Sequence, residues 1–127
     1  MPKEFITSHQ ELHVYQMAFE SAMEIFAQAQ SFPHEERTLL TEQIVRSSRW
    51  VCAHLAHAWQ QRRAPEAFIA SLNAVAASAA ETQTWLEFAI MCSYLDAEPG
   101  QELFGRYGEI LAGTARLIDR ADSWGIS

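Results

Sequence analysis

Apolar residues recur in alternating steps of three and four along most of the chain, and this period limits the fold more than any other feature. Residues three and four positions apart share one face of an α-helix, whereas a half-buried strand would need alternate positions. No window alternates apolar and polar residues, and no Asn-Gly or Asp-Gly turn separates β-branched runs. The pattern therefore predicts an all-α protein without a sheet.

Prolines and turn-forming residues divide this periodic pattern into four segments. Pro33 and Pro65 each stand at a helix start, where the N–H that proline lacks would have no partner inside the helix. The segment Asp-Ala-Glu-Pro-Gly at residues 96–100 is typical of a turn. We predict one domain over residues 1–127, with helices over residues 9–30, 34–62, 66–95 and 99–121.

Each predicted helix carries one stripe of apolar and small residues that we expect to face a shared core. In the first helix the stripe is Leu12, Tyr15, Phe19, Ala22 and Phe26. In the second it is Leu40, Ile44, Ser47, Val51, Leu55 and Ala58. In the third it is Phe68, Leu72, Val75, Ala79, Thr82, Leu86 and Ala89. In the fourth it is Leu103, Tyr107, Ile110, Thr114, Leu117 and Ala121. Because short turns join the helices, we predict an antiparallel up-down-up-down four-helix bundle.

Length and charge narrow the classes of function. A chain of 127 residues can bury a core without a disulfide or a metal. The formal net charge of −7 argues against indiscriminate attraction to nucleic acid or to an anionic membrane. The chain has neither a leader-like start nor a run of ~20 apolar residues, so we expect a cytoplasmic protein that does not enter a membrane. Cys52 and Cys92 fall at different levels of the predicted bundle, so we expect free buried thiols.

Short motifs follow one another in a fixed order along the predicted helices. They are Leu12-His13-Val14-Tyr15-Gln16-Met17-Ala18, Phe32-Pro33 with Glu36, Gln43-Ile44 with Arg46, then Phe68, Leu72, Ser78, Glu81, Thr84, Leu86, Ala89 and Tyr94-Leu95. In these motifs the chain resembles, from end to end, the bacterial four-helix-bundle proteins first noted as open reading frames in intervening sequences of 23S ribosomal RNA genes.

This resemblance implies a homo-oligomer, in related proteins a ring of five bundles, so we expect a homopentamer. Related accessory proteins of diversity-generating retroelements use a basic surface to engage nucleic acid and a reverse transcriptase. Here His54-Leu55-Ala56-His57-Ala58 stands where the family usually has Asn-Ile-Ala-Glu-Gly, and Val45 stands where a second arginine is common. This departure and the acidic net charge argue against nucleic-acid binding, while the expected fold is unaffected.

A second apolar stripe on the predicted second helix indicates a contact beyond the bundle. Val45, Cys52 and Trp59 repeat at heptad spacing, about 100° around the helix from the core stripe. Apolar surface that a core leaves over usually marks an interface. We expect these three residues to join copies of the chain, and the alternative is that they pack on flanking helices of the same chain.

A polar strip on the same helix contains one large aromatic side chain. Its members, at steps of three, four and seven, are Gln43, Arg46, Trp50, His57 and Gln61. Trp and Arg are enriched in binding hot spots, and together they could also stack on a base and bind a phosphate. With Arg49, Arg62 and Arg63 the strip is a candidate surface for a protein partner or nucleic acid. The alternative is a solvated face with one amphipathic tryptophan at its rim.

The sequence gives little support for metal binding or catalysis. His9 and His13 share one helix face, as do His54 and His57, but no Glu-x-x-His pair of the kind that di-metal bundles use accompanies them. The chain also lacks a Gly-rich phosphate loop, a nucleophile elbow, a CxxC pair and an HExxH motif. We therefore expect no metal, no cofactor and no catalytic residue.

Two hypotheses of function follow from the sequence. The first is a non-enzymatic homo-oligomeric scaffold or adaptor, assembled partly through the second helix. The alternative is a nucleic-acid-associated accessory protein in which arginines of the second helix from several copies form a basic rim: Arg46, Arg49, Arg62 and Arg63. Salt-dependent binding of labelled RNA or DNA would separate the two.

Overall fold

The computed structural model describes residues 6–124, and these residues form helices and connecting turns without a strand. The long helices are α1 (His13–Ala29), α2 (Glu42–Gln60), α3 (Pro65–Met91) and α4 (Ala97–Asp119), and a short helix α5 (Ala121–Trp124) follows. The all-helical class predicted from the sequence is therefore confirmed. The ends of the predicted domain, residues 1–5 and 125–127, lie outside the described residues.

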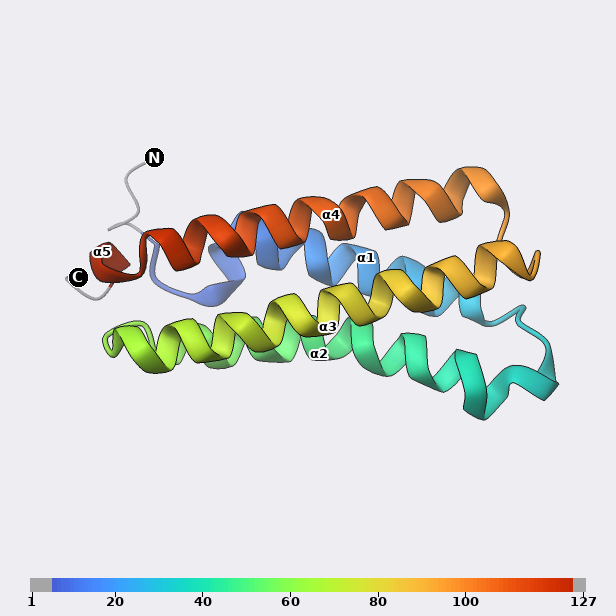
Figure 1. The fold of residues 1–127 in the computed structure, drawn as a ribbon, viewed down its shortest axis with the longest axis horizontal. Helices are drawn as coiled ribbons and strands as arrows, with labels where there is room; N and C mark the ends of the chain where they lie inside the picture. The colour runs from blue at the N-terminus through green and yellow to red at the C-terminus, as the bar shows by residue number, and fades with distance from the viewer. Residues whose placement is uncertain (1–5, 125–127) are drawn as a thin grey trace.

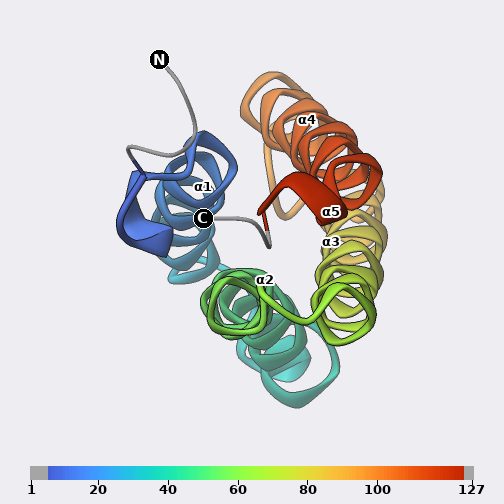
Figure 2. The same cartoon turned by 90° about the vertical axis from the view of Figure 1, so that its left-hand side faces the viewer.

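The four long helices lie side by side along the long axis of the molecule (Figure 1). α2 packs against α1 and α3, and α4 packs against α3 and α1. Viewed from the end, the helices surround a common centre in chain order (Figure 2). Each helix therefore has one face toward the core and another toward solvent.

The stripes predicted for the second and third helices form the core. Every member of both stripes is buried, and so are the members of the fourth stripe except Leu117, which is half-buried. In the middle of the core, the Thr82 hydroxyl of α3 donates a hydrogen bond to the Ser47 hydroxyl of α2 at 2.8 Å. Near the surface, Arg106 of α4 forms an ion pair with Glu24 of α1 at 2.9 Å.

The stripe predicted for the first helix is wrong at Phe19 and Phe26. Both side chains are exposed, whereas Leu12 and Ala22 of that stripe are buried. The buried residues of α1 are Val14, Ala18, Ser21, Ala22, Ile25 and Ala29. This face holds the same three-and-four spacing, but most of its side chains are small. Small side chains let a neighbouring helix approach closely, so the aromatic residues are displaced to the outside.

The first two helices begin later than predicted. A 3-10 turn spans His9–Glu11, and Leu12 is extended with φ −70° and ψ 129°, so α1 begins at His13. In place of one helix over residues 34–62, a 3-10 turn (His34–Glu36) and a π-helical turn (Arg37–Thr41) precede α2. A π turn is wider than an α turn, and here Leu40 is buried while Leu39 faces solvent.

The third predicted helix, residues 66–95, ends earlier, at Met91. Ser93 has a φ of 64°, a left-handed conformation that a regular α-helix cannot include. Two glycines then permit close packing of α4. A Cβ atom at Gly100 would lie 2.6 Å from Cγ1 of Ile90, and one at Gly113 would lie 3.3 Å from Cγ2 of Val14. None of the helices over residues 6–124 is long and apolar enough to cross a membrane.

Candidate functional site

Exposed apolar side chains are the most unusual feature of the surface. Seven large apolar side chains of the described residues are between 40% and 83% exposed, namely Phe19, Met23, Phe26, Leu39, Trp50, Phe88 and Met91. Single exposed apolar residues are ordinary, but contiguous groups of them usually mark a binding surface. These residues therefore lead to the candidate site.

A groove with a volume of about 520 Å³ runs between α1 and α2. We call it the α1–α2 groove, and its lining residues are Phe26, Gln30, Thr41, Glu42, Val45, Arg46, Arg49, Trp50 and Ala53. α1 contributes Phe26, Gln30 directly follows α1, and the remaining residues come from the π turn and from the first turns of α2. The groove is thus built on two packed helices, which hold its walls in place.

Aromatic and cationic side chains line this groove in contact with one another. The guanidinium of Arg49 lies 5.4 Å from the centre of the Phe26 ring, within the range of a cation–π interaction across the two helices. The Trp50 ring stacks on His54 of the next turn, with centroids 4.9 Å apart and planes 25° apart. About half of the Trp50 side chain remains exposed. These rings form an apolar wall that is already ordered in one chain.

The arginines of the groove have no carboxylate partner within the described chain. Among residues 6–124, the ion pairs involve Arg37 with Glu42 at 3.5 Å, and Arg106 with Glu24 and Glu102. Glu42 is therefore already paired with Arg37, while Arg46 and Arg49 are exposed beside the groove. The α1–α2 groove combines an apolar floor with a positive rim.

Partial burial also affects the imidazole next to the groove. The pKa of His54 is lowered, first because burial against Trp50 disfavours the charged form and then because His57 lies nearby. His9, by contrast, packs edge-on against Tyr15 with centroids 4.8 Å apart.

The structure brings together four of the predicted site residues. Val45, Arg46, Arg49 and Trp50 all line the α1–α2 groove. Gln43 does not line it, since its side chain donates to the Thr38 carbonyl at 3.2 Å. His57, Arg62 and Arg63 follow at the other end of α2 and are also outside the groove.

The predicted interface stripe of Val45, Cys52 and Trp59 is wrong at Trp59. This side chain is only 3% exposed and belongs to the core of a single chain. The Arg62 guanidinium covers its ring at 4.4 Å and donates to the Trp59 carbonyl at 3.0 Å. Cys52 is half-buried, and burial raises the pKa of its thiol to about 11. Cys92 is exposed, so the expected free thiols are present but only one of them is shielded.

A second apolar surface, which the sequence did not predict, lies at the end of α3. We call it the α3 ridge, and it comprises Leu39, Trp85, Phe88 and Met91. The Trp85 and Phe88 rings lie 6.0 Å apart, and the Trp85 indole donates to Glu81 at 3.0 Å. The three α3 residues recur every third position, which is a weak signal beside the strong core stripe of the same helix.

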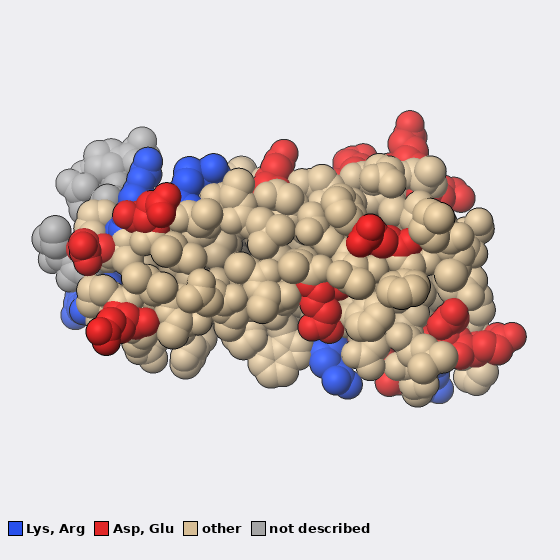
Figure 3. Space-filling view, viewed as in Figure 1, with Lys and Arg blue, Asp and Glu red and all other residues tan. Residues whose placement is uncertain are grey.

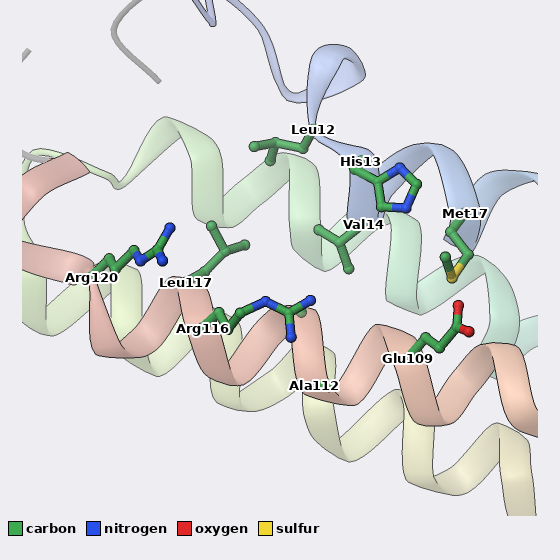
Figure 4. A pocket seen from close by; sticks show the side chains of 10 residues that line it. Leu12, His13, Val14, Met17, Glu109, Ala112, Arg116, Leu117 and Arg120 are labelled. Carbon is green, nitrogen blue, oxygen red and sulfur yellow. The ribbon is translucent and has the colours of Figure 1, made fainter. Parts of the chain in front are cut away.

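A cleft of about 330 Å³ lies at the opposite end of the molecule, between the start of α1 and the end of α4. Figure 4 shows Glu109, Arg116 and Arg120 extending from α4 toward α1, which carries His13. α2 also ends at this end of the molecule, with Arg62 and Arg63 following it (Figure 1). The four arginines predicted as one rim are therefore divided, with Arg46 and Arg49 at the groove and the other two at this basic end.

Comparison with known proteins supplies a family for the fold. A family model described as 23S rRNA-intervening sequence protein matches residues 10–115, which include both helices of the groove. A solved structure, described as a protein with unknown function from the S23 ribosomal protein family of Bacteroides thetaiotaomicron, is similar with a TM-score of 0.73. It is 25% identical, over 84% of this chain and 95% of that chain. The search of curated proteins gives no match.

Proposed function

Because this chain belongs to the family of 23S rRNA-intervening sequence proteins, we propose that it is a cytoplasmic, non-enzymatic scaffold or adaptor whose copies assemble through the α1–α2 groove. The observation that carries this proposal is the exposed apolar surface. Phe26 on α1 is 40% exposed, and Trp50 on the neighbouring helix α2 is 48% exposed. Covering such surface is worth ~25 cal/mol per Å² removed from water, which favours association.

The chemistry of the groove supports binding rather than catalysis. Its lining is dominated by aromatic, aliphatic and arginine side chains, with Trp50 and Arg49 of the types that most often carry binding energy. These side chains need no cofactor to recognise a protein surface. The resemblance to family members adds the expected number of copies, which is five arranged in a ring.

We further infer that each copy is an antiparallel up-down-up-down four-helix bundle. Successive long helices pack against one another, and α4 packs back on α1. The connections between the long helices are short enough to join antiparallel neighbours. A bundle of this kind would hold the two sides of the groove rigidly, as a preformed interface requires.

Light scattering on the purified full chain tests the assembly. We expect a mass of several 14.4 kDa chains, five by family resemblance. Trp50→Glu should lower the mass toward that of one chain, because a charge in the groove would have to be desolvated on assembly. Ala115→Glu adds the same charge on the exposed face of α4 and serves as the control. A wild-type mass of 14.4 kDa at micromolar concentration would contradict the proposal.

Nucleic-acid association is a second candidate function, favoured by four arginines at the end of the molecule where α2 and α4 end. Arg116 and Arg120 line the cleft there, and Arg62 and Arg63 follow the end of α2 at the same end of the molecule. Figure 3 shows basic side chains over the C-terminal end of α4, with acidic side chains close beside them. Several copies in one ring would repeat this group of arginines and strengthen phosphate binding.

Binding of labelled RNA at ~50 mM salt tests this second candidate, since phosphate contacts are strong at low salt. Arg116→Glu combined with Arg120→Glu should weaken binding many-fold, whereas Arg46→Glu, at the other half of the molecule, should have a smaller effect. If the wild-type protein binds no RNA under these conditions, the candidate fails, and the scaffold proposal is unaffected.

A further inference from the structure

The α3 ridge is as exposed as the α1–α2 groove but differs from it in shape. Met91 is 83% exposed, Leu39 69% and Phe88 53%. Leu39, Trp85 and Phe88 line a hollow of about 400 Å³ together with Leu40 and Cys92, and Met91 lies outside that lining. Met91 has a flexible, unbranched side chain that can fill an irregular apolar recess. Met91 is therefore the knob of the ridge, whereas the groove is a recess.

The two surfaces lie on different sides of α2. α1 and α3 each pack against α2, and the end view places them on either side of it (Figure 2). The groove lies between α1 and α2, while the ridge follows α3 and the π turn that precedes α2. Both belong to the half of the molecule in which α2 begins and α3 ends (Figure 1). One copy could therefore contact two neighbours at once, one through each surface.

Charge distinguishes the two surfaces as well. The groove is bordered by Arg46 and Arg49, which have no ion-pair partner over residues 6–124. The ridge is bordered by acidic residues, with Glu87 exposed beside Phe88 and Glu36 in the lining of its hollow. Figure 3 shows acidic side chains gathered at the end of the molecule where α3 ends. The positive rim of the groove thus complements the negative border of the ridge.

We propose that the α3 ridge of one copy docks into the α1–α2 groove of a second copy, with Met91 and Phe88 against Phe26 and Trp50. This inference rests on the proposed function, because it names the surfaces through which the copies assemble. A groove-to-groove contact would bring Arg46 and Arg49 of two copies together and repel them. A contact between two different surfaces is heterologous, so each copy offers one knob and one recess, and repetition closes a ring or extends a filament.

Complementary variants test this pairing. Trp50→Glu destroys the recess and leaves the knob, and Met91→Asp destroys the knob and leaves the recess. Both residues are exposed, so circular dichroism should show unchanged helix content. Each variant alone should have the mass of one chain by light scattering. Mixed one to one, they should form a dimer containing one copy of each and nothing larger, because only one intact knob and one intact recess remain to meet.

Exchanging the charges of Arg49 and Glu87 provides an independent test of the pairing. Arg49→Glu alone and Glu87→Arg alone should each weaken assembly at least several-fold in a dilution series, and the two changes in one chain should restore it. Ala115→Glu, outside both surfaces, should keep the wild-type mass. If Met91→Asp keeps the wild-type mass, or if the mixture of single-surface variants stays monomeric, the pairing is overturned. The scaffold proposal would then stand, since it fails only if the wild-type chain is itself monomeric.

Discussion

The phenol of Tyr94 donates a hydrogen bond of 2.8 Å to a carboxylate oxygen of Glu36. This contact joins the segment that follows α3 to the 3-10 turn that precedes α2. It therefore fixes the π turn carrying Leu39 relative to the end of α3, and so it holds the α3 ridge together. The hydrogen bond to the Glu36 carboxylate also raises the pKa of Tyr94 to about 12.

This raised pKa predicts a loss of stability at high pH. Tyrosine in the unfolded chain ionises near pH 10, before the folded Tyr94, so the stabilising effect is full below pH 10 and is lost as the pH rises toward 12. Tyr15 and Tyr107 also have raised pKa values, mainly through burial, and contribute in the same direction. Tyr94→Phe should reduce the decline without abolishing it, measured as the urea midpoint against pH. An unchanged pH profile in this variant would contradict the assignment.

Trp59 and Met23 should differ sharply when they are shortened to alanine. Trp59→Ala removes a buried ring from the core and should lower the free energy of unfolding by about 3–5 kcal/mol. Met23→Ala changes an exposed side chain of α1 and should remain within about 0.5 kcal/mol of the wild type. Urea denaturation monitored by circular dichroism measures both. A small effect at Trp59 would mean that its ring is not part of the core.

Two glycines of α4 predict opposite effects of the same substitution. A Cβ at Gly105 would have open space around it, with no packed neighbour within 4 Å, so Gly105→Ala should stabilise the helix by ~0.5–1 kcal/mol. A Cβ at Gly100 would lie 2.6 Å from Cγ1 of Ile90, so Gly100→Ala should destabilise the protein by about 1–3 kcal/mol. Thermal melts of the two variants compare them directly. Stabilisation by both changes would contradict this prediction and show that the Ile90 side chain can move aside at little cost.

The two thiols should react at very different rates in the folded protein. Cys52 is shielded and its pKa is raised to about 11, so only about one thiol in a thousand is ionised at pH 8. Cys92 is exposed and should react first with a thiol reagent such as DTNB. Cys92→Ser should leave one slow thiol, and urea should make that thiol fast. Rapid labelling of native Cys92→Ser would contradict the burial of Cys52.

Periodicity predicted the core faces of α2 and α3, where every member of the predicted stripe is buried. It failed on α1, where two stripes share the same spacing. The stripe with Phe19 and Phe26 suggested the core, but the face with Ala18 and Ile25 packs inside. Hydrophobicity measures the gain from burial, whereas close helix packing also requires small side chains. The three-and-four spacing alone does not show which of these two effects is larger.

The candidate site was predictable only as far as it lies on one helix. Val45, Arg46, Arg49 and Trp50 were identified on α2, but their partner Phe26 comes from α1 and had been assigned to the core. The α3 ridge depends on Leu39, which lies in the π turn that precedes α2 and is exposed. Trp59 was assigned to an interface, but its ring belongs to the core of one chain and is also covered by Arg62. Contacts between helices and irregular turns decide whether these residues are buried or exposed. The apolar periodicity of a single helix predicts neither.

The described chain starts and finishes at the same end of the molecule, beside the last turns of α4, and the groove lies in the other half (Figure 1). A passenger domain fused to either terminus would therefore leave the association surfaces clear. In a closed ring every passenger would emerge on one rim, and the assembly would become a multivalent display in which weak individual contacts add up to high avidity.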